Sequence, residues 1–380
     1  MVHHTFMQQL SIPPLYCPFP STLHPQAEAL TQHATSWAQQ FHLFEDAAAS
    51  ERFFAEQYWR LIAHVYPTAD FASLALIADW NTWGFYLDDL GDRPAVGHDP
   101  LAMQHIFDAI LAVMHEQPTV RPEPLFMSLH DIWQRIVPRS TLAWRERLRQ
   151  TLRISFLSYI WEATNRSQQV HPTHDAYVRM RVFTGAWLTY VHFLELVEQI
   201  ALPAAIQNHP QLRAYLTAVN NTIVWANDLV SFAKEQGIDE THNLITIVQL
   251  EQDCSLAEAT RLVALYHNEE VRRCLELERG LSILSVPYRP EIEKYIAFAH
   301  RFMRSNLDWS MESSRYGQRV IPLMGSPTSM PPKAVLAVPV AAPFSLLRSR
   351  RTSVRWGLGG IGGLLASAGL GWIYWQKKHR

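Results

Sequence analysis

Apolar residues recur at steps of three and four over most of the chain, from about residue 26 to about residue 316. This spacing is typical of α-helices, because residues three and four apart share one helical face. One such stripe consists of Trp187, Val191, Leu194 and Val197, and another segment contains Ile223, Trp225, Ala226 and Val230. Alternation with a period of two, which would predict strands, is rare. The pattern therefore predicts an all-α fold, a single large bundle of roughly ten helices.

Proline and glycine support this interpretation. Prolines fall between the apolar stretches, where helix ends are expected, as at Pro67, Pro94, Pro172 and Pro210. Glycines are sparse in residues 1–316, which argues against a turn-rich β-sandwich. With 48% hydrophobic residues, the chain can bury a large core, and intrinsic disorder of this part is excluded.

Charge divides the chain into two parts. Residues 1–316 carry 24 Lys and Arg and all 35 Asp and Glu, whereas residues 317–380 carry 9 Lys and Arg and no acidic residue. The formal net charge of -2 is therefore an average over two unlike parts. We place a domain boundary near residue 317, because one folded surface would not change composition so abruptly. An acidic body argues against nucleic-acid binding, which needs clustered cations facing phosphates.

The C-terminal part has two segments. Residues 317–347 are rich in proline and alanine and are expected to form an extended linker. Residues 348–380 contain an uncharged stretch from Trp356 to Trp375, flanked by Lys and Arg, that as a helix matches the thickness of a bilayer core. Gly359 and Gly363 form a candidate helix-dimerisation face, which suggests a homodimer. The seven glycines in this stretch leave a flexible tail or an interfacial segment as alternatives to a membrane anchor.

Cysteine usage and the N-terminus bear on the compartment. Cys17, Cys254 and Cys274 show no paired or CxxC spacing, which favours a reducing environment and argues against a disulfide framework or a zinc ribbon. The N-terminus lacks a basic region followed by an apolar run, so no secretory signal is expected. We therefore expect a cytoplasmic catalytic domain, with the C-terminal segment as its candidate membrane anchor.

An aspartate-rich motif, DDLGD, occupies residues 88–92 at the end of an apolar aromatic run. On a helix Asp88 and Asp92 share a face, with Asp89 about 100° round from Asp88. Three carboxylates this close repel one another unless a multivalent cation neutralises them, and carboxylates suit Mg²⁺. The alternative interpretation is a solvated acidic helix end followed by a turn.

A second motif, NDLVSFAKE, occupies residues 227–235. Asn227, Ser231 and Glu235 are spaced four apart, so all three project from one helical face within about 80°. An amide oxygen, a hydroxyl and a carboxylate in a row supply three oxygen ligands for Mg²⁺, and Lys234 is suited to contact an anion. The alternative is an ordinary polar helix face. However, Asn and Ser are mediocre helix formers, so their place inside a helix needs a reason.

Together the two motifs resemble those of bacterial class I terpene synthases. The resemblance extends over about residues 15–316, including a PFP sequence at 18–20, and two more elements lie at the family's spacing. Arg181 lies 46 residues before Asn227, where the family has an arginine that senses diphosphate. An Arg-Tyr pair, Arg315–Tyr316, follows at the end of the similar region. The resemblance implies the class I terpenoid synthase helical bundle as the fold of a catalytic domain at 1–316.

The resemblance also implies roles for individual residues. Three Mg²⁺ ions are expected on Asp88, Asp89, Asp92, Asn227, Ser231 and Glu235. Arg181, Lys234, Arg315 and Tyr316 are expected to bind the diphosphate of a prenyl diphosphate. Thr184 and Gly185 take the places of the family's linker and effector residues, with Gly185 acting through its carbonyl at a helix break. Thr184 departs from the acidic residue or serine that is common there.

An apolar pocket is expected beneath the metals, because water would quench an allylic carbocation. Phe85, Trp80, Trp83 and Trp309 are candidate linings, with ring faces that stabilise a cation by about 0.5–2 kcal/mol each. Phe85, one turn before Asp88, and Trp309 are the foremost candidates as catalytic residues. Core packing is the alternative for each ring. We assign no catalytic role to the histidines, and His242–Asn243 is expected to be a surface or capping pair.

The expected activity is Mg²⁺-dependent ionisation and cyclisation of a linear prenyl diphosphate, a lyase reaction that releases diphosphate. The family's habit favours farnesyl diphosphate and a sesquiterpene product. Geranyl and geranylgeranyl diphosphate remain alternative substrates, because pocket depth sets chain length. A prenyl-chain elongase is a further alternative, although residues 227–235 lack the second aspartate-rich motif that it would need. A catalytically inactive, membrane-tethered isoprenoid-binding protein is the alternative from another class.

Overall fold

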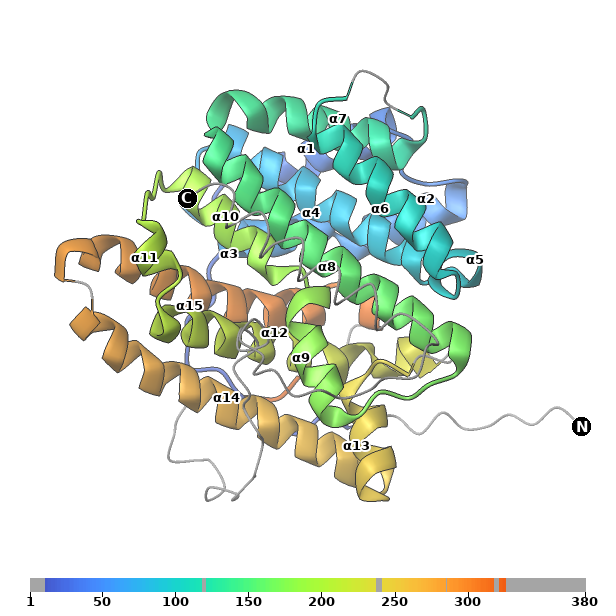
Figure 1. Ribbon diagram of the computed structural model, residues 1–380, viewed down its shortest axis with the longest axis vertical. Helices are drawn as coiled ribbons and strands as arrows, with labels where there is room; N and C mark the ends of the chain where they lie inside the picture. Colours follow the sequence, from blue (N-terminus) through green and yellow to red (C-terminus); the bar gives the residue numbers. More distant parts are fainter. Residues whose placement is uncertain (1–10, 118–120, 237–240, 285, 318–320, 326–380) are drawn as a thin grey trace, which may run out of the picture. The chain divides into compact units, whose positions relative to one another are not determined.

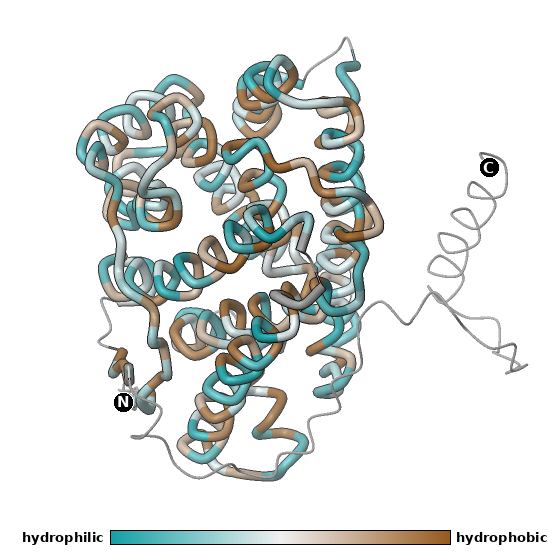
Figure 2. The backbone as a smooth tube through the Cα atoms, turned by 90° about the vertical axis from the view of Figure 1, so that its left-hand side faces the viewer, coloured by the Kyte–Doolittle hydropathy of each residue, from teal (hydrophilic) through white to brown (hydrophobic). Residues whose placement is uncertain are grey.

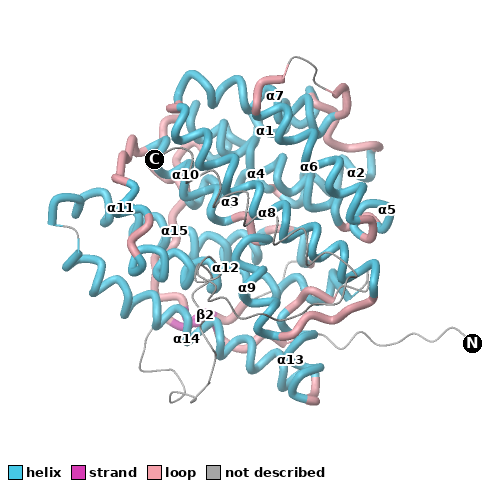
Figure 3. The backbone as a smooth tube through the Cα atoms, in the orientation of Figure 1, coloured by secondary structure: helices cyan, strands magenta, loops and turns pink. Residues whose placement is uncertain are grey.

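The computed structural model describes residues 11–117, 121–236, 241–284, 286–317 and 321–325. The chain divides into two units, Met1–Leu336 and Ala337–Arg380, and every described residue belongs to the first. These residues are mostly helical, which confirms the predicted all-α fold (Figures 1 and 3). The α-helices in the described residues outnumber the roughly ten expected, in part because two of them, α5 and α11, are a single turn.

The helices have the following bounds: α1 Ala27–Gln40, α2 Ala47–Glu56, α3 Tyr58–Val65, α4 Phe71–Gly91, α5 Pro94–Gly97, α6 Pro100–Met114, α7 Pro124–Ile136, α8 Leu142–Gln168, α9 His174–Thr184, α10 Trp187–Val197, α11 Ala204–Gln207, α12 Pro210–Gln236, α13 Leu244–Gln252, α14 Leu256–Leu284 and α15 Arg289–Glu312. Three 3-10 helices are η1 Val137–Arg139, η2 Val286–Tyr288 and η3 Ser314–Tyr316. The strands are β1 Leu15–Tyr16 and β2 Leu323–Met324.

Helices α4 and α12, which carry the two motifs, are both embedded in the bundle. Helix α12 packs against α14, α15, α9 and α13, and α4 packs against α3, α7 and α1. Helix α3 contacts both α4 and α15, so it joins the two groups. Figure 2 shows brown and teal alternating along the helical tubes, as expected for helices with one apolar and one polar face. The motif helices are therefore fixed by packing on several sides.

Local sequence signals set where these helices begin. Asp70 caps α4 by accepting a hydrogen bond from the Ser73 amide at 2.9 Å. Pro210 opens α12, where its missing N–H costs no helical hydrogen bond. Asn243 caps α13 by accepting a hydrogen bond from the Ile245 amide at 2.9 Å. With α4 and α12 beginning at these positions, Asp88 lies in the last turn of α4 and Asn227 lies well inside α12.

A break separates α9 from α10 at the position expected from the sequence. Gly185 ends α9, and Ala186 adopts a left-handed conformation with φ 53° before α10 begins at Trp187. A Cβ atom on Gly185 would lie 2.4 Å from a methyl carbon of Val224 on α12. Glycine is therefore required here by the close approach of α12.

Two short strands, one near each end of the described residues, pair with each other. Leu15 pairs with Leu323 and Tyr16 with Met324 in parallel register. The Tyr16 amide also donates to the Asn268 side chain on α14 at 2.6 Å, and Ile321 is buried. The sequence pattern indicated few strands and did not locate this pair. Residues 321–325, at the start of the segment expected to be a linker, thus pack on the helical unit.

None of the helices within the described ranges is both long and apolar enough to cross a membrane. The stretch from Trp356 to Trp375, proposed above as a candidate anchor, lies outside the described residues, as do most of 317–347 and all of 348–380.

Candidate active site

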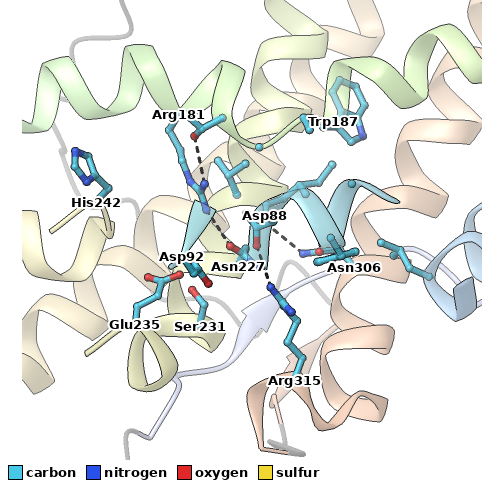
Figure 4. Close-up of a pocket in the computed structure, with 18 of the residues that line it drawn as sticks. Asp88, Asp92, Arg181, Trp187, Asn227, Ser231, Glu235, His242, Asn306 and Arg315 are labelled. Atoms are coloured by element: carbon cyan, nitrogen blue, oxygen red, sulfur yellow. Dashed lines mark hydrogen bonds and ion pairs between the residues drawn. The ribbon is translucent and has the colours of Figure 1, made fainter. Parts of the chain in front are cut away.

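A pocket of about 200 Å³ lies between α4, α8, α9, α12 and α15 (Figure 4). It brings together residues from the aspartate-rich motif, the second motif, the segment around Arg181 and the Arg315–Tyr316 pair. Those that line it are Phe85, Asp88, Asp92, Arg181, Thr184, Gly185, Asn227, Ser231, Lys234, Glu235, Trp309, Arg315 and Tyr316. Asp89 does not line the pocket but belongs to the same carboxylate cluster. Residues that are more than 200 positions apart thus meet at one place.

The aspartate-rich motif forms a compact cluster at the end of α4. Asp88, Asp89 and Asp92 each offer one carboxylate oxygen, and these oxygens lie within 4.8 Å of one another. Burial and the neighbouring Asp92 raise the pKa of Asp88 to about 6. For Asp89, burial is outweighed by the Arg315 guanidinium, and the pKa is lowered. This cluster favours any bound cation, because like charges at short range repel.

The second motif faces the first across the pocket. Figure 4 shows Ser231 and Glu235 of α12 next to Asp92, which ends α4. Burial, with Asp228 as the next contributor, raises the pKa of Glu235 to about 7. The Ser231 hydroxyl is buried and has no hydrogen-bond partner among the described residues. Oxygen donors of this kind, one of them unpartnered, fit a hard divalent cation.

Three cations surround these oxygen donors. Arg181 on α9 donates to the Asn227 side-chain oxygen at 2.9 Å and to Asp228 at 2.8 Å. Lys234 forms an ion pair with Asp92 at 2.9 Å. Arg315 forms ion pairs with Asp88 and Asp89, both at 2.9 Å. Each expected anion-binding cation is thus already engaged with an expected metal ligand or its neighbour.

Tyr316 and Thr184 complete the polar part of the pocket. The Asn227 amide nitrogen donates to the Tyr316 hydroxyl at 2.8 Å. The Thr184 hydroxyl accepts a hydrogen bond from Arg181 at 3.3 Å. Its carbonyl accepts one from the Tyr159 hydroxyl at 2.8 Å, just before the helix break. Thr184 therefore links Arg181 to the α9–α10 break through a neutral hydroxyl rather than a carboxylate.

Aromatic side chains form part of the pocket wall, but only two of the four candidates from the sequence line it. Phe85 and Trp309 line it, with ring centroids 5.1 Å apart. Trp80 and Trp83 do not line it, and for these two rings the alternative, core packing, is confirmed. Trp80 packs against Trp83 with ring centroids 5.1 Å apart, and the Trp83 indole donates to the Leu125 carbonyl at 2.9 Å.

Helical geometry explains this difference. The face of α4 that lines the pocket carries Asn81, Gly84, Phe85 and Asp88, spaced by three, one and three residues. At about 100° per residue, Trp80 lies about 90° and Trp83 about 150° from the centre of this face. Both rings are buried among α4 and its neighbours instead.

Comparison with known proteins assigns the family. The model of terpene synthase family 2, described as C-terminal metal binding, matches residues 79–273. The chain belongs to terpene synthase family 2. The match spans both motifs and Arg181, which confirms the resemblance to class I terpene synthases seen in the sequence. A divalent metal is indicated by the metal-binding description of the family together with the aspartate cluster.

Curated relatives of this terpene synthase cover most of both chains. Germacrene A synthase from Nostoc punctiforme is 30% identical over 311 residues, which are 82% of this chain and 96% of the relative. The farnesyl diphosphate-cyclising (+)-T-muurolol synthase from Roseiflexus castenholzii is 31% identical over 305 residues, which are 80% of this chain and 93% of the relative. These relatives are lyases of the terpene synthase class, and the expected enzyme class agrees with them.

Solved structures support the fold. The crystal structure of germacradien-4-ol synthase from Streptomyces citricolor matches with a TM-score of 0.69 at 24% identity, over 78% of this chain and 98% of that chain. Linalool/nerolidol synthase from Streptomyces clavuligerus matches with a TM-score of 0.70 at 20% identity, over 78% and 99%. The helical bundle of this terpene synthase is therefore that of its family.

Several residues in or beside the pocket of the terpene synthase were not found from the sequence. Asn243, in the pair expected to be at the surface or capping, is a cap, but it is also fully buried and donates to Glu235 at 2.7 Å. His242 is buried and lines the pocket, and so does Tyr159 on α8. Asp228 accepts hydrogen bonds from the Tyr177 hydroxyl at 2.6 Å as well as from Arg181. Of these, only Asp228 had a signal, its position inside the second motif.

Proposed function

We propose that this terpene synthase ionises and cyclises farnesyl diphosphate to a sesquiterpene, with release of diphosphate, and that it requires three Mg²⁺ ions. The observation that carries the proposal is the pairing of two facing rows of oxygen donors with three surrounding cations in one pocket. A row of anionic oxygens alone would bind metal, and cations alone would bind an anion. Both together are suited to a metal–diphosphate complex.

The oxygen donors have a defined part in this proposal. Asp88, Asp89 and Asp92 would hold Mg²⁺ from α4, and Asn227, Ser231 and Glu235 would hold it from α12. The bound metal would stabilise the negative charge of the leaving diphosphate. The unpartnered Ser231 hydroxyl supports the second set, because a cation would satisfy it. The raised pKa of Glu235 supports it too, because a cation would offset the cost of burying the carboxylate charge.

The cations and Tyr316 would bind the diphosphate itself. Arg181 and Arg315 offer planar guanidinium groups that match phosphate oxygens, and Lys234 adds a point charge. All three side chains would exchange carboxylate or amide partners for diphosphate oxygens when the substrate enters. Gly185, at the break after α9, would present its carbonyl to the pocket. Thr184 would couple the position of Arg181 to that break through the hydrogen bond between the two side chains.

The apolar wall would protect the carbocation. The rings of Phe85 and Trp309 contact each other and line the same pocket as Asp88, where the diphosphate would leave. Each ring face stabilises a nearby cation by about 0.5–2 kcal/mol. The named activities of the relatives favour farnesyl diphosphate over geranyl or geranylgeranyl diphosphate.

Product analysis tests the proposal. The full-length chain is incubated with C10, C15 and C20 prenyl diphosphates, with MgCl₂ or with EDTA, and the products are analysed by gas chromatography and mass spectrometry. Cyclic C15 hydrocarbons or alcohols that disappear with EDTA are expected. Longer diphosphates would indicate a prenyl-chain elongase, and absence of turnover would indicate an isoprenoid-binding protein.

For the C-terminal part we propose a membrane association of the otherwise cytoplasmic enzyme through residues 356–375. The support is compositional: an uncharged stretch with aromatic ends and basic flanks, together with the GxxxG pair at Gly359 and Gly363 as a dimerisation face. Cells expressing the chain with and without residues 348–380 are fractionated. Equal amounts of both forms in the soluble fraction would exclude the anchor.

A further inference from the structure

A sharp corner between α2 and α3 lies against Arg315. Glu56 is the last residue of α2, Gln57 adopts a left-handed conformation with φ 50° and ψ 50°, and Tyr58 is the first residue of α3. A non-glycine residue in this conformation costs about 1 kcal/mol or more, so the surrounding structure must enforce it. The corner brings the Glu56 and Tyr58 side chains to the same guanidinium.

The corner is also fixed by hydrogen bonds from α15 and from Ser313, the residue that follows α15. The Trp309 indole donates hydrogen bonds to the carbonyl oxygens of Glu56 and Gln57, both at 3.1 Å. The Ser313 hydroxyl donates to the same Glu56 carbonyl at 2.9 Å. The indole of Trp309 therefore has a second contact besides the pocket that its ring lines. It ties α15 to the corner that carries Tyr58.

The Arg315 guanidinium is divided between two sets of partners. Its Nη1 donates to the Tyr58 hydroxyl at 3.0 Å and to Glu56 at 3.1 Å. Its Nη2 donates to Asp88 and Asp89, both at 2.9 Å. One edge thus faces the corner and the other faces the aspartate-rich motif. With 3% of its side chain exposed, Arg315 has little room to adopt another orientation.

Tyr58 is the central member of this network. A hydroxyl has one proton to donate. Here the Tyr58 hydroxyl faces the carboxylates of Glu56 and, at 3.3 Å, Asp89 as acceptors for its proton, which leaves a lone pair toward Arg315. The Tyr58 ring also stacks on Phe85, with centroids 4.5 Å apart, and Arg315 lies 4.9 Å above the Phe85 ring. The hydroxyl and the rings together restrict the plane of the guanidinium.

We propose that Tyr58, oriented by Glu56, is a positioning residue that keeps the Nη1 edge of Arg315 in place, so that the Nη2 edge is presented to the diphosphate of the substrate. This inference rests on the proposed function, because Arg315 must bind diphosphate. When diphosphate enters, the Nη2 edge would exchange its aspartate partners while the Nη1 edge keeps its own. The ordering of the guanidinium would thus be complete before the substrate binds, which lowers the entropy cost of binding.

The chain contains a matched control for this network. The Tyr295 hydroxyl on α15 donates to Glu195 at 2.6 Å, and Glu195 also forms an ion pair with Arg147. Tyr295 is buried like Tyr58, although Arg147 is more exposed than Arg315, and none of the three residues of this second group lines the pocket. Replacing either tyrosine by phenylalanine removes one hydroxyl and leaves the ring in place. The two substitutions should therefore cost similar stability.

The test measures binding of inorganic diphosphate, in the presence of MgCl₂, by isothermal titration calorimetry on the full-length chain. Tyr58→Phe is expected to weaken the affinity about tenfold, or about 1.4 kcal/mol, as for one hydrogen bond to a charged group. Tyr295→Phe is expected to leave the affinity unchanged. In an Arg315→Lys background, Tyr58→Phe should change the affinity less than about threefold, because residues that act through one another are not additive.

Each result has a definite meaning. Unchanged affinity in Tyr58→Phe overturns the inference, and so does an equal loss of affinity in Tyr58→Phe and Tyr295→Phe. A full tenfold effect of Tyr58→Phe in the Arg315→Lys background overturns it too, because Tyr58 would then act without Arg315. A melting temperature that falls far more in Tyr58→Phe than in Tyr295→Phe assigns Tyr58 a structural role instead. If the wild type neither binds diphosphate nor converts prenyl diphosphates, the proposed function itself fails.

Discussion

Arg181 and Asn227, 46 residues apart in the chain, are joined by a hydrogen bond of 2.9 Å from the guanidinium to the amide oxygen. The amide nitrogen of Asn227 donates in turn to the Tyr316 hydroxyl at 2.8 Å. Asn227 is therefore oriented from both ends. Since an amide oxygen has two lone pairs, one remains for a cation while the other accepts from Arg181. The proposed diphosphate-binding and metal-binding groups thus form one chain of hydrogen bonds in this pocket.

Asn227→Ala and Asp88→Ala are each expected to abolish turnover. Each removes a proposed oxygen ligand of the metal, and Asn227→Ala also removes the link between Arg181 and Tyr316. Both positions lie late in long helices that are fixed by packing, so the fold should persist. Activity is measured with farnesyl diphosphate, and helicity by circular dichroism. Activity at the wild-type level in either variant would refute the metal assignment.

Ser231→Ala separates metal binding from stability. The Ser231 hydroxyl is buried without a hydrogen-bond partner among the described residues, so its removal should leave the melting temperature unchanged or raise it slightly. The loss of one oxygen ligand should raise the Mg²⁺ concentration needed for half-maximal activity by about tenfold or more. Thr222→Ala on the same helix, whose hydroxyl donates to the Val219 carbonyl at 2.7 Å, serves as control. A normal Mg²⁺ requirement in Ser231→Ala would show that this hydroxyl is not a ligand.

Gly185→Ala tests the close approach of α12 to the helix break. The added methyl group would lie 2.4 Å from a Val224 methyl carbon, so the break must shift or α12 must move away. Overpacking of this kind typically lowers the free energy of unfolding by about 1–3 kcal/mol. We therefore expect a lower melting temperature together with reduced turnover. Val224→Ala in the same chain removes the clashing methyl and should restore most of the melting temperature. If the double variant is no more stable than Gly185→Ala, the contact with Val224 is not the cause.

His267 makes stability depend on pH. Burial lowers the pKa of this histidine to about 4, below its ordinary value of 6.5. As the pH falls from 6.5 toward 4, the unfolded chain binds a proton that the folded chain does not, and the free energy of unfolding falls. The loss reaches about 3 kcal/mol near pH 4, and above pH 6.5 this contribution is fully present. His267→Gln should remove that part of the dependence in urea unfolding measured across this pH range.

The exposed His105 provides the control for this titration. His105→Gln should leave the slope of stability against pH as it is in the wild type. The opposite pattern, a slope that persists in His267→Gln and disappears in His105→Gln, would contradict the assignment.

Much of the second motif follows from its spacing. Asn227, Ser231 and Glu235 repeat every four residues, and a helix with 3.6 residues per turn must place them on one face. The same reasoning locates Asp88 and Asp92 on one face of α4. It does not choose between faces, however, and for this reason it left open whether Trp80 and Trp83 line the pocket or pack in the core. Whether a face of α4 meets a pocket or a neighbouring helix depends on the other helices.

The sequence by itself determined the elements and their order: an all-α chain, two rows of oxygen donors at helical spacing, an arginine 46 residues before Asn227 and an Arg-Tyr pair at the end. These depend on local periodicity, which is a property of the backbone. Only the tertiary structure decided that Arg315 lies against Asp88, 227 residues away, and that Tyr58 lies against both Arg315 and Phe85. Such contacts arise from the packing of α3, α4 and α15 against one another, and side-chain shape across several helices sets that packing.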